Sequence, residues 1–170
     1  MHPRSGSAHL FLRERAEALS REARSRPRLR LNLNLHAMED PVHRLFNAVE
    51  PGTYIRPHRH LDPPRTETVV VVAGRVGLLV FDAGGDVLEH AVLEPGGQIF
   101  GAEIPAGTWH TFVALESGGV FLEVKEGPYV SPGRGDVATW APPEGDPSAA
   151  ETETRLRTIF LDREKSFTST

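Results

Sequence analysis

Short apolar runs that each end at a turn recur through the middle of the chain, and they constrain its fold more than any other feature. The runs cover residues 67–73, 75–82, 87–93, 98–104, 110–115 and 120–125. Turns rich in glycine or proline separate them, among them Gly84-Gly85, Pro95-Gly96-Gly97 and Ser117-Gly118-Gly119. Short strands at this regular spacing predict an all-β fold, built as an antiparallel sandwich or barrel.

Two other patterns precede these runs. Leucines alternate with polar residues over 29–36, and this two-residue period predicts a half-buried strand. Residues 8–25 mix apolar residues with Arg and Glu, contain no Gly or Pro, and stop before Pro27. They predict an N-terminal amphipathic helix.

These patterns divide the chain into three parts. We expect an N-terminal arm and amphipathic helix over 1–27, the β-barrel over 28–143, and a polar C-terminal tail over 144–170. The tail has one apolar patch at 156–161. We expect this patch either to dock as a terminal strand or helix or to contact a second subunit.

Composition excludes several classes of function. The 170 residues contain no cysteine, which rules out disulfides, thiolate metal ligands and cysteine nucleophiles. The formal net charge of −4 gives no general attraction for nucleic acid or an anionic membrane. The chain has no apolar run of a signal peptide and none near the roughly 20 residues of a membrane span, so we expect a cytoplasmic protein that binds neither nucleic acid nor membrane.

Three histidines carry the chemistry. His58 and His60 are two residues apart, so on a strand both imidazoles would face the same side, and the carboxylate of Glu67 follows on the next run. His110 begins a predicted strand about fifty residues later, after the turn at Pro105 and Gly107. Imidazole is a common metal ligand near neutral pH. These side chains can converge only if the sheet closes on itself, as a small barrel does.

The spacing of these residues resembles the two motifs of the cupin superfamily. The first is Gly52, His58-x-His60, Glu67 and Gly74, and the second is Pro105-x-Gly107-x-x-His110. Longer stretches look like the WbuC-type cupin metalloproteins, small bacterial proteins sometimes encoded near surface-polysaccharide genes. These stretches are LNLNLH (31–36), RLFNAVEPGTYIRPHRH (44–60), EIPAGTWHTFVALE (103–116), EVKEGPY (123–129) and WAPPEGD (140–146).

The resemblance covers roughly residues 28–147 and implies both a fold and a ligand set. The implied fold is an antiparallel double-stranded β-helix, or jelly roll, here with an N-terminal helix. The implied metal ligands are His58, His60, Glu67 and His110. Three imidazoles and a carboxylate suit one divalent transition metal ion, either Fe, Mn, Ni, Co or Zn. Cupin barrels often pair through sheet edges, and we expect a homodimer.

The sequence departs from the cupin pattern in two places. Six residues separate His60 from Glu67, where many cupins have three or four. Glu67 therefore either coordinates the metal in a different approach or stands behind the ligands. Ala114 occupies the position where the second motif usually ends in Asn, which changes the pocket lining and leaves the ligands intact.

The residues around the histidines indicate a small polar or anionic ligand. Arg56 alternates with His58 and His60, so we place it in the substrate pocket, where Arg suits a carboxylate or phosphate. Lys125 and Glu123 share a strand face, and we expect one of them to enter the pocket. We interpret Arg59 and Arg65 as solvated.

Two functions fit these residues. The favoured one is a metal-dependent enzyme acting on a sugar or sugar acid, of the isomerase, epimerase or oxygenase type. Such an enzyme needs a general acid or base, for which Glu123, Tyr129 and His36 are the candidates. The alternative is a non-catalytic module in which a metal organises a pocket that binds or senses a saccharide.

Overall fold

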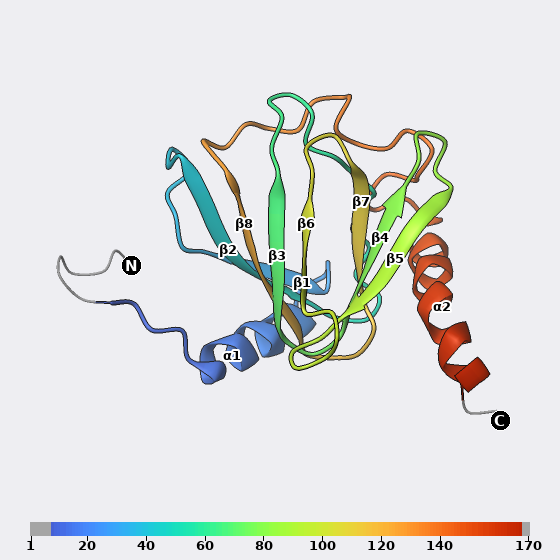
Figure 1. Ribbon diagram of the computed structural model, residues 1–170, viewed down its shortest axis with the longest axis horizontal. Coiled ribbons are helices and arrows are strands. Elements are labelled where there is room, and N and C mark those ends of the chain that lie inside the picture. The colour runs from blue at the N-terminus through green and yellow to red at the C-terminus, as the bar shows by residue number, and fades with distance from the viewer. Residues whose placement is uncertain (1–7, 168–170) are drawn as a thin grey trace.

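Two antiparallel sheets face each other and carry a helix on each outer side (Figure 1). The computed structural model describes residues 8–167, with side chains for residues 8–161. The arrangement is a jelly roll with an N-terminal helix, which confirms the predicted fold class. Residues 1–7 of the predicted arm and 168–170 of the predicted tail lie outside the described part of the chain.

Eight strands make up the two sheets. The larger sheet has the order β1 (Arg30–Asn34), β2 (Val42–Val49), β8 (Gly119–Glu126), β3 (Glu67–Ala73) and β6 (Gly101–Ile104). The smaller sheet has the order β5 (Val87–Leu93), β4 (Val76–Phe81) and β7 (Trp109–Ala114). All six apolar runs form strands, and β2 is an additional strand that we did not predict.

The space between the sheets has an apolar end and a polar end. Along β3, Glu67 is followed on the inner face by Val69 and Val71, which join the buried core between the sheets. Along β7, His110 is followed in the same way by Phe112. The antiparallel neighbour β8 runs in the opposite direction, so its apolar Phe121 comes first and its polar residues come later. The polar residues of all three strands therefore gather at one end of the barrel.

Helix α1 (Arg13–Arg24) covers the outer face of the larger sheet. Its Leu19 and Ala23 pack against Ala48 and Val120, together with the leucines of β1. The leucines of the predicted half-buried strand thus face α1, while Asn32 and Asn34 on the opposite face line the interior cavities. The helix is shorter than the predicted range 8–25, and the residues before it are largely exposed.

Helix α2 (Ala149–Phe167) covers the outer face of the smaller sheet. Leu156 and Phe160 are buried there against Leu79 and Val113. A Cβ at Gly77 would lie only 2.6 Å from the Phe160 ring, so the glycine permits the close approach of α2 to β4. The apolar patch of the tail is thus part of a helix docked on its own barrel.

Neither helix within residues 8–167 combines the length and the apolar character needed to cross a membrane.

Candidate metal centre

Four side chains converge at the polar end of the barrel: His58, His60, Glu67 and His110. One ligand atom from each lies within 4.8 Å of the others. Glu67 begins β3 in the larger sheet, His110 lies on β7 in the smaller sheet, and the other two belong to the segment that precedes β3. The cluster therefore joins both sheets, as the closed barrel predicted.

The segment that carries His58 and His60 belongs to neither sheet. The His58 N–H donates to the His110 carbonyl at 3.0 Å, and the His58 carbonyl accepts a hydrogen bond from the His110 N–H at 2.9 Å, which forms an isolated bridge. Pro57 has no N–H to continue a ladder on this side. The prediction that these two histidines lie on a strand is therefore wrong, although the bridge still aligns His58 with His110.

Backbone carbonyls fix the tautomers of two imidazoles. Nδ1 of His58 lies 3.1 Å from the Arg56 carbonyl, and Nδ1 of His110 lies 2.9 Å from the Thr108 carbonyl. Because a carbonyl can only accept, Nδ1 must be the donor in both rings, and Nε2 keeps its lone pair. Nε2 of His110 is buried and has no hydrogen-bond partner. A buried acceptor of this kind is what a metal ligand needs, so the residues present fit a metal ion.

The surroundings keep His58 and His110 neutral and Glu67 ionised, which are the protonation states that bind a metal. Burial lowers the pKa of His58 to about 3 and also lowers the pKa of His110, so both rings are neutral. Burial alone would raise the pKa of Glu67, but the hydrogen bond from His60 at 2.8 Å and the charge of Lys125 outweigh it and lower that pKa. The neutral imidazoles of His58 and His110, beside the ionised carboxylate of Glu67, can bind a cation through Nε2 without losing a proton.

A second polar group adjoins the cluster on β8. Nζ of Lys125 lies 2.6 Å from one oxygen of Glu123 and 3.7 Å from Glu67, and the amide of Asn47 donates to the other Glu123 oxygen at 2.7 Å. Burial, followed by repulsion from Glu67, raises the pKa of Glu123. Burial would lower the pKa of Lys125, but its two carboxylate neighbours raise it overall. Lys125 is thus a partly buried cation between two buried carboxylates.

Two cavities meet at Lys125. The larger has a volume of about 670 Å³ and is lined by His58, Glu67, Glu123 and, at another part of its wall, Arg28 and Arg30. The smaller has a volume of about 160 Å³ and is lined by His60 and by two of the predicted acid–base candidates, His36 and Tyr129. We expected one of Glu123 and Lys125 to enter the pocket, and both line the larger cavity.

The other predicted site residues have defined surroundings. His36 stacks on His43 with ring centres 3.9 Å apart, and Tyr129 is 52% exposed. Arg56 lines neither cavity, and its guanidinium donates to the Ala138 carbonyl.

Four residues near the cavities were either misinterpreted or not identified from the sequence: Arg65, Asn47, Arg28 and Arg30. Arg65, interpreted as solvated, is only 6% exposed and donates to the Pro128 carbonyl. Asn47 was not predicted as a site residue, because β2 lacks a clear alternation. The position of Arg28 and Arg30 at the larger cavity was not predicted either. The one signal for these arginines was their position at the start of the alternating run.

Residues 11–93 match a family model described as a domain of unknown function, DUF6016. No curated protein matches the sequence. Among solved structures, KdgF from Halomonas sp. is 20% identical with a TM-score of 0.48, and the match covers 62% of this chain and 85% of that one. An oxalate oxidase in complex with the substrate analogue glycolate is 21% identical with a TM-score of 0.47, covering 59% of this chain and 52% of that one. Oxalate decarboxylase from Bacillus subtilis is 19% identical with a TM-score of 0.47, covering 60% of this chain and 26% of that one. These structural neighbours are cupins.

Proposed function

We propose that the protein is a cupin-type metalloenzyme that acts on a small polar or anionic substrate such as a sugar acid. His58, His60, Glu67 and His110 would hold one divalent transition metal. The observation that supports this most is the position of Nε2 of His110, buried without a partner and 4.0 Å from the Glu67 carboxylate. Such a set suits Fe, Mn, Ni, Co or Zn, and the bound ion would polarise a substrate oxygen.

Glu123 is the proposed proton carrier. Its raised pKa brings the carboxyl group closer to the neutral pH at which a general acid or base works best, and it lines the larger cavity beside Glu67. Asn47 fixes one carboxyl oxygen and Lys125 holds the other, so the group is oriented before a substrate arrives. His36 and Tyr129 line the smaller cavity and are the second candidates.

A proton carrier beside a metal site favours isomerase or epimerase chemistry, in which a proton moves at a carbon next to a carbonyl group. An oxygenase would need the same ligands with iron but would not need Glu123. The effect of Glu123 on turnover therefore separates the two reaction types.

The test combines metal analysis with a substrate screen. The purified protein is stripped, reloaded with each of the five metals, and assayed on sugars, sugar acids and keto acids with and without oxygen. We expect turnover with at least one metal, and we expect Glu123→Gln to keep the metal while lowering kcat by about 10²–10⁴-fold. Saccharide binding without turnover under every condition would instead favour the non-catalytic sensor.

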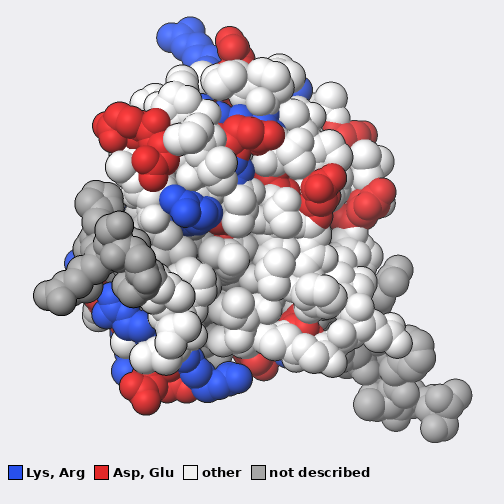
Figure 2. Space-filling model, turned by 60° about the vertical axis from the view of Figure 1, so that its left-hand side comes forward, with Lys and Arg blue, Asp and Glu red and all other residues white. Residues whose placement is uncertain are grey.

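The sequence motifs shared with WbuC-type proteins support a role near surface-polysaccharide synthesis, and we include this role in the proposal. We also propose a homodimer. Figure 2 shows a broad face whose middle carries few charged side chains. Ile99 and Phe100, which precede the edge strand β6, are 46% and 58% exposed. Light scattering after gel filtration should give twice the mass of one chain, and a monomer at all concentrations would contradict the dimer.

A further inference from the structure

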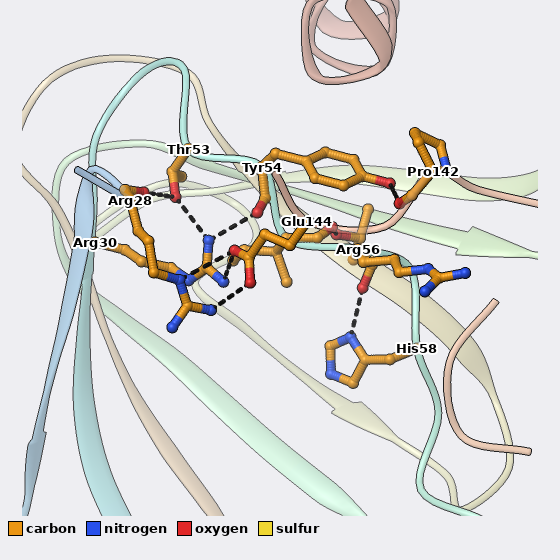
Figure 3. A network of polar contacts seen from close by, with 10 residues as sticks. Arg28, Arg30, Thr53, Tyr54, Arg56, His58, Pro142 and Glu144 are labelled. Atoms are coloured by element: carbon orange, nitrogen blue, oxygen red, sulfur yellow. Dashed lines mark hydrogen bonds and ion pairs between the residues drawn. The ribbon is translucent and has the colours of Figure 1, made fainter. Parts of the chain in front are cut away.

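A cluster of ion pairs lies at the wall of the larger cavity (Figure 3). Nε and Nη2 of Arg28 donate to the two carboxylate oxygens of Glu144 at 3.1 and 2.6 Å. Arg30 donates to the same carboxylate through its own Nη2. Both arginines line the cavity that reaches His58 and Glu67, whereas Glu144 is not among its lining residues. Glu144, which lies outside the cavity, thus binds the guanidinium groups of two arginines in the cavity wall.

Arg30 is held in place independently of Glu144. Its Nη1 donates to the Tyr54 carbonyl at 2.7 Å and approaches the Thr53 hydroxyl at 3.4 Å. The Thr53 hydroxyl in turn donates to the Arg28 carbonyl at 2.8 Å. The side chain of Arg30 is 19% exposed, compared with 62% for Arg28. Arg30 is therefore held by the barrel, whereas Arg28 is largely exposed.

The backbone between the two arginines is unusual. Leu29 has a φ of 53°, the one positive value for a residue other than glycine in the described part of the chain. Hydrogen bonds from Leu29 N–H to the Arg26 carbonyl and from Glu50 N–H to the Leu29 carbonyl hold this conformation. A left-handed conformation at leucine is costly and is found where the surrounding structure has a use for it. Leu29 lies between Arg28 and Arg30, whose side chains both bind the carboxylate of Glu144.

Charge balance at the cluster favours an anion. Two guanidinium groups share a single carboxylate, which leaves an excess positive charge beside the cavity. Burial is the largest influence on the pKa of Arg30 and lowers it, while the charge of Glu144 opposes this effect. Arg30 thus needs an anionic partner, and planar forks of this kind are suited to carboxylates.

The segment that carries Glu144 is anchored at Pro142 and partly exposed at Glu144 itself. Glu144 follows Pro142 and Pro143, precedes Gly145 with a φ of 87°, and is 38% exposed in its side chain. The Tyr54 hydroxyl donates to the Pro142 carbonyl at 2.9 Å, so the segment is anchored just before Glu144. Four residues after Tyr54 comes His58, whose ring is oriented by the carbonyl of Arg56 (Figure 3). The arginine cluster and the metal ligands therefore share one stretch of backbone.

We propose that Arg28 and Arg30 form a carboxylate-binding site for the ligand of the larger cavity, and that Glu144 occupies this site as an internal competitor. A ligand carboxylate displaces Glu144, and the ligand's hydroxyl or carbonyl oxygens face the histidines. The identity of the ligand as a small hydroxylated carboxylate rests on the proposed function. A cavity of about 670 Å³ is of a size that holds such a molecule.

The test measures affinity by calorimetry in protein with and without metal. The probes are D-galacturonate, D-gluconate and glycolate, with D-galactose as the neutral counterpart. We expect Glu144→Gln to bind at least one of the carboxylates about fivefold more tightly, because the amide no longer competes for the forks. Arg28→Gln should bind that carboxylate about tenfold more weakly. In the double variant Arg28→Gln/Glu144→Gln, the gain from the Glu144 change should disappear.

Controls separate this site from general effects of charge. Glu151→Gln, an exposed change on α2, should leave every affinity unchanged, and D-galactose should bind all variants alike. Glu144→Asp keeps the charge on a shorter side chain and should give an intermediate affinity. The proposal is overturned if Glu144→Gln has no higher affinity than the unaltered protein for any of the carboxylates. It is also overturned if the affinity for D-galactose rises by the same factor. The proposed enzyme function is tested separately by the turnover assay, so its failure can be distinguished from failure of the carboxylate site.

Discussion

His110 shows most clearly how a single residue is prepared for a metal. Its Nδ1 is committed to the Thr108 carbonyl, and its buried Nε2 has no partner among the described residues. Replacing it with alanine removes one of the four candidate ligands. We expect His110→Ala and His58→Ala to reduce bound metal from about one ion per chain to less than about a tenth, since each removes one of only four ligands.

Elemental analysis after desalting measures this loss. The control is His9→Ala, which removes an exposed histidine outside the cluster and should leave the metal content unchanged. A full metal complement in both His58→Ala and His110→Ala would show that the cluster is not the metal site.

The charge of Lys125 stabilises two neighbouring carboxylates, Glu67 and Glu123. Its ammonium group lies 3.7 Å from Glu67 and 2.6 Å from Glu123. We expect Lys125→Met to lower the free energy of unfolding of the metal-free protein by about 1–3 kcal/mol, because two buried carboxylates lose their common partner.

Urea unfolding at neutral pH measures the change. Adding Glu123→Gln to the Lys125→Met variant removes one of the two negative charges, and we expect it to recover part of the loss. If the double variant is as unstable as the sum of the single variants, the three groups do not interact and the charge argument is wrong.

Among the structural elements, α1 depends on one buried carboxylate. Glu50 at the end of β2 is 3% exposed and accepts hydrogen bonds from Ser20 on α1 and from Ser117 and the Gly118 N–H in the turn before β8. We expect Glu50→Gln to lower the free energy of unfolding by about 1–3 kcal/mol near neutral pH, since an amide cannot accept all of these bonds.

The pH dependence of this loss has a definite sign. Burial would raise the pKa of Glu50, but the hydrogen bonds from Ser117, Ser20 and Arg24 lower it below the usual 4.5. The carboxylate therefore stabilises the fold fully above about pH 4.5, and the contribution is lost as pH falls through the lowered value. The difference between Glu50→Gln and the unaltered protein should shrink in acid. Glu116→Gln, exposed beside the same turn, is the control and should show no difference.

The elements differ in how well the sequence predicts them. The runs at 67–73 and 87–93 match β3 and β5 residue for residue, because each is a short apolar run that ends at a turn. β2 was missed since Leu45 and Phe46 are adjacent and His43 is buried, which breaks the alternation. The docking of α2 depends on the fit of Phe160 against Gly77, a contact between positions far apart in the chain. No local pattern carries that information.

At the scale of the whole molecule, closure of the barrel is what made the candidate site predictable. The resemblance to the cupin motifs implied that His110 joins His58 inside a closed barrel, and the structure brings these residues together. The groups around them were harder to anticipate. Glu144 meets Arg28 across 116 positions, and Asn47 meets Glu123 across 76. Such contacts depend on which side chains share a surface after folding, and spacing within either segment does not encode them.

The same closure couples metal binding to the stability of the whole fold. The four ligands come from both sheets and from the segment between β2 and β3, so the unfolded chain cannot present them together. A metal at about 100 times its dissociation constant therefore stabilises the folded state by about 2.7 kcal/mol. For a chain of this size, that corresponds to a rise in Tm of about 5–10 °C.

Thermal unfolding with saturating metal and with a chelator measures this rise. His58→Ala provides the matched comparison, because it removes one of the four ligands, and its Tm should not respond to metal. His9→Ala should respond like the unaltered protein, since it leaves all four ligands in place. An equal rise in His58→Ala would mean that the metal stabilises the protein from another place, and the link between barrel closure and metal binding would be lost.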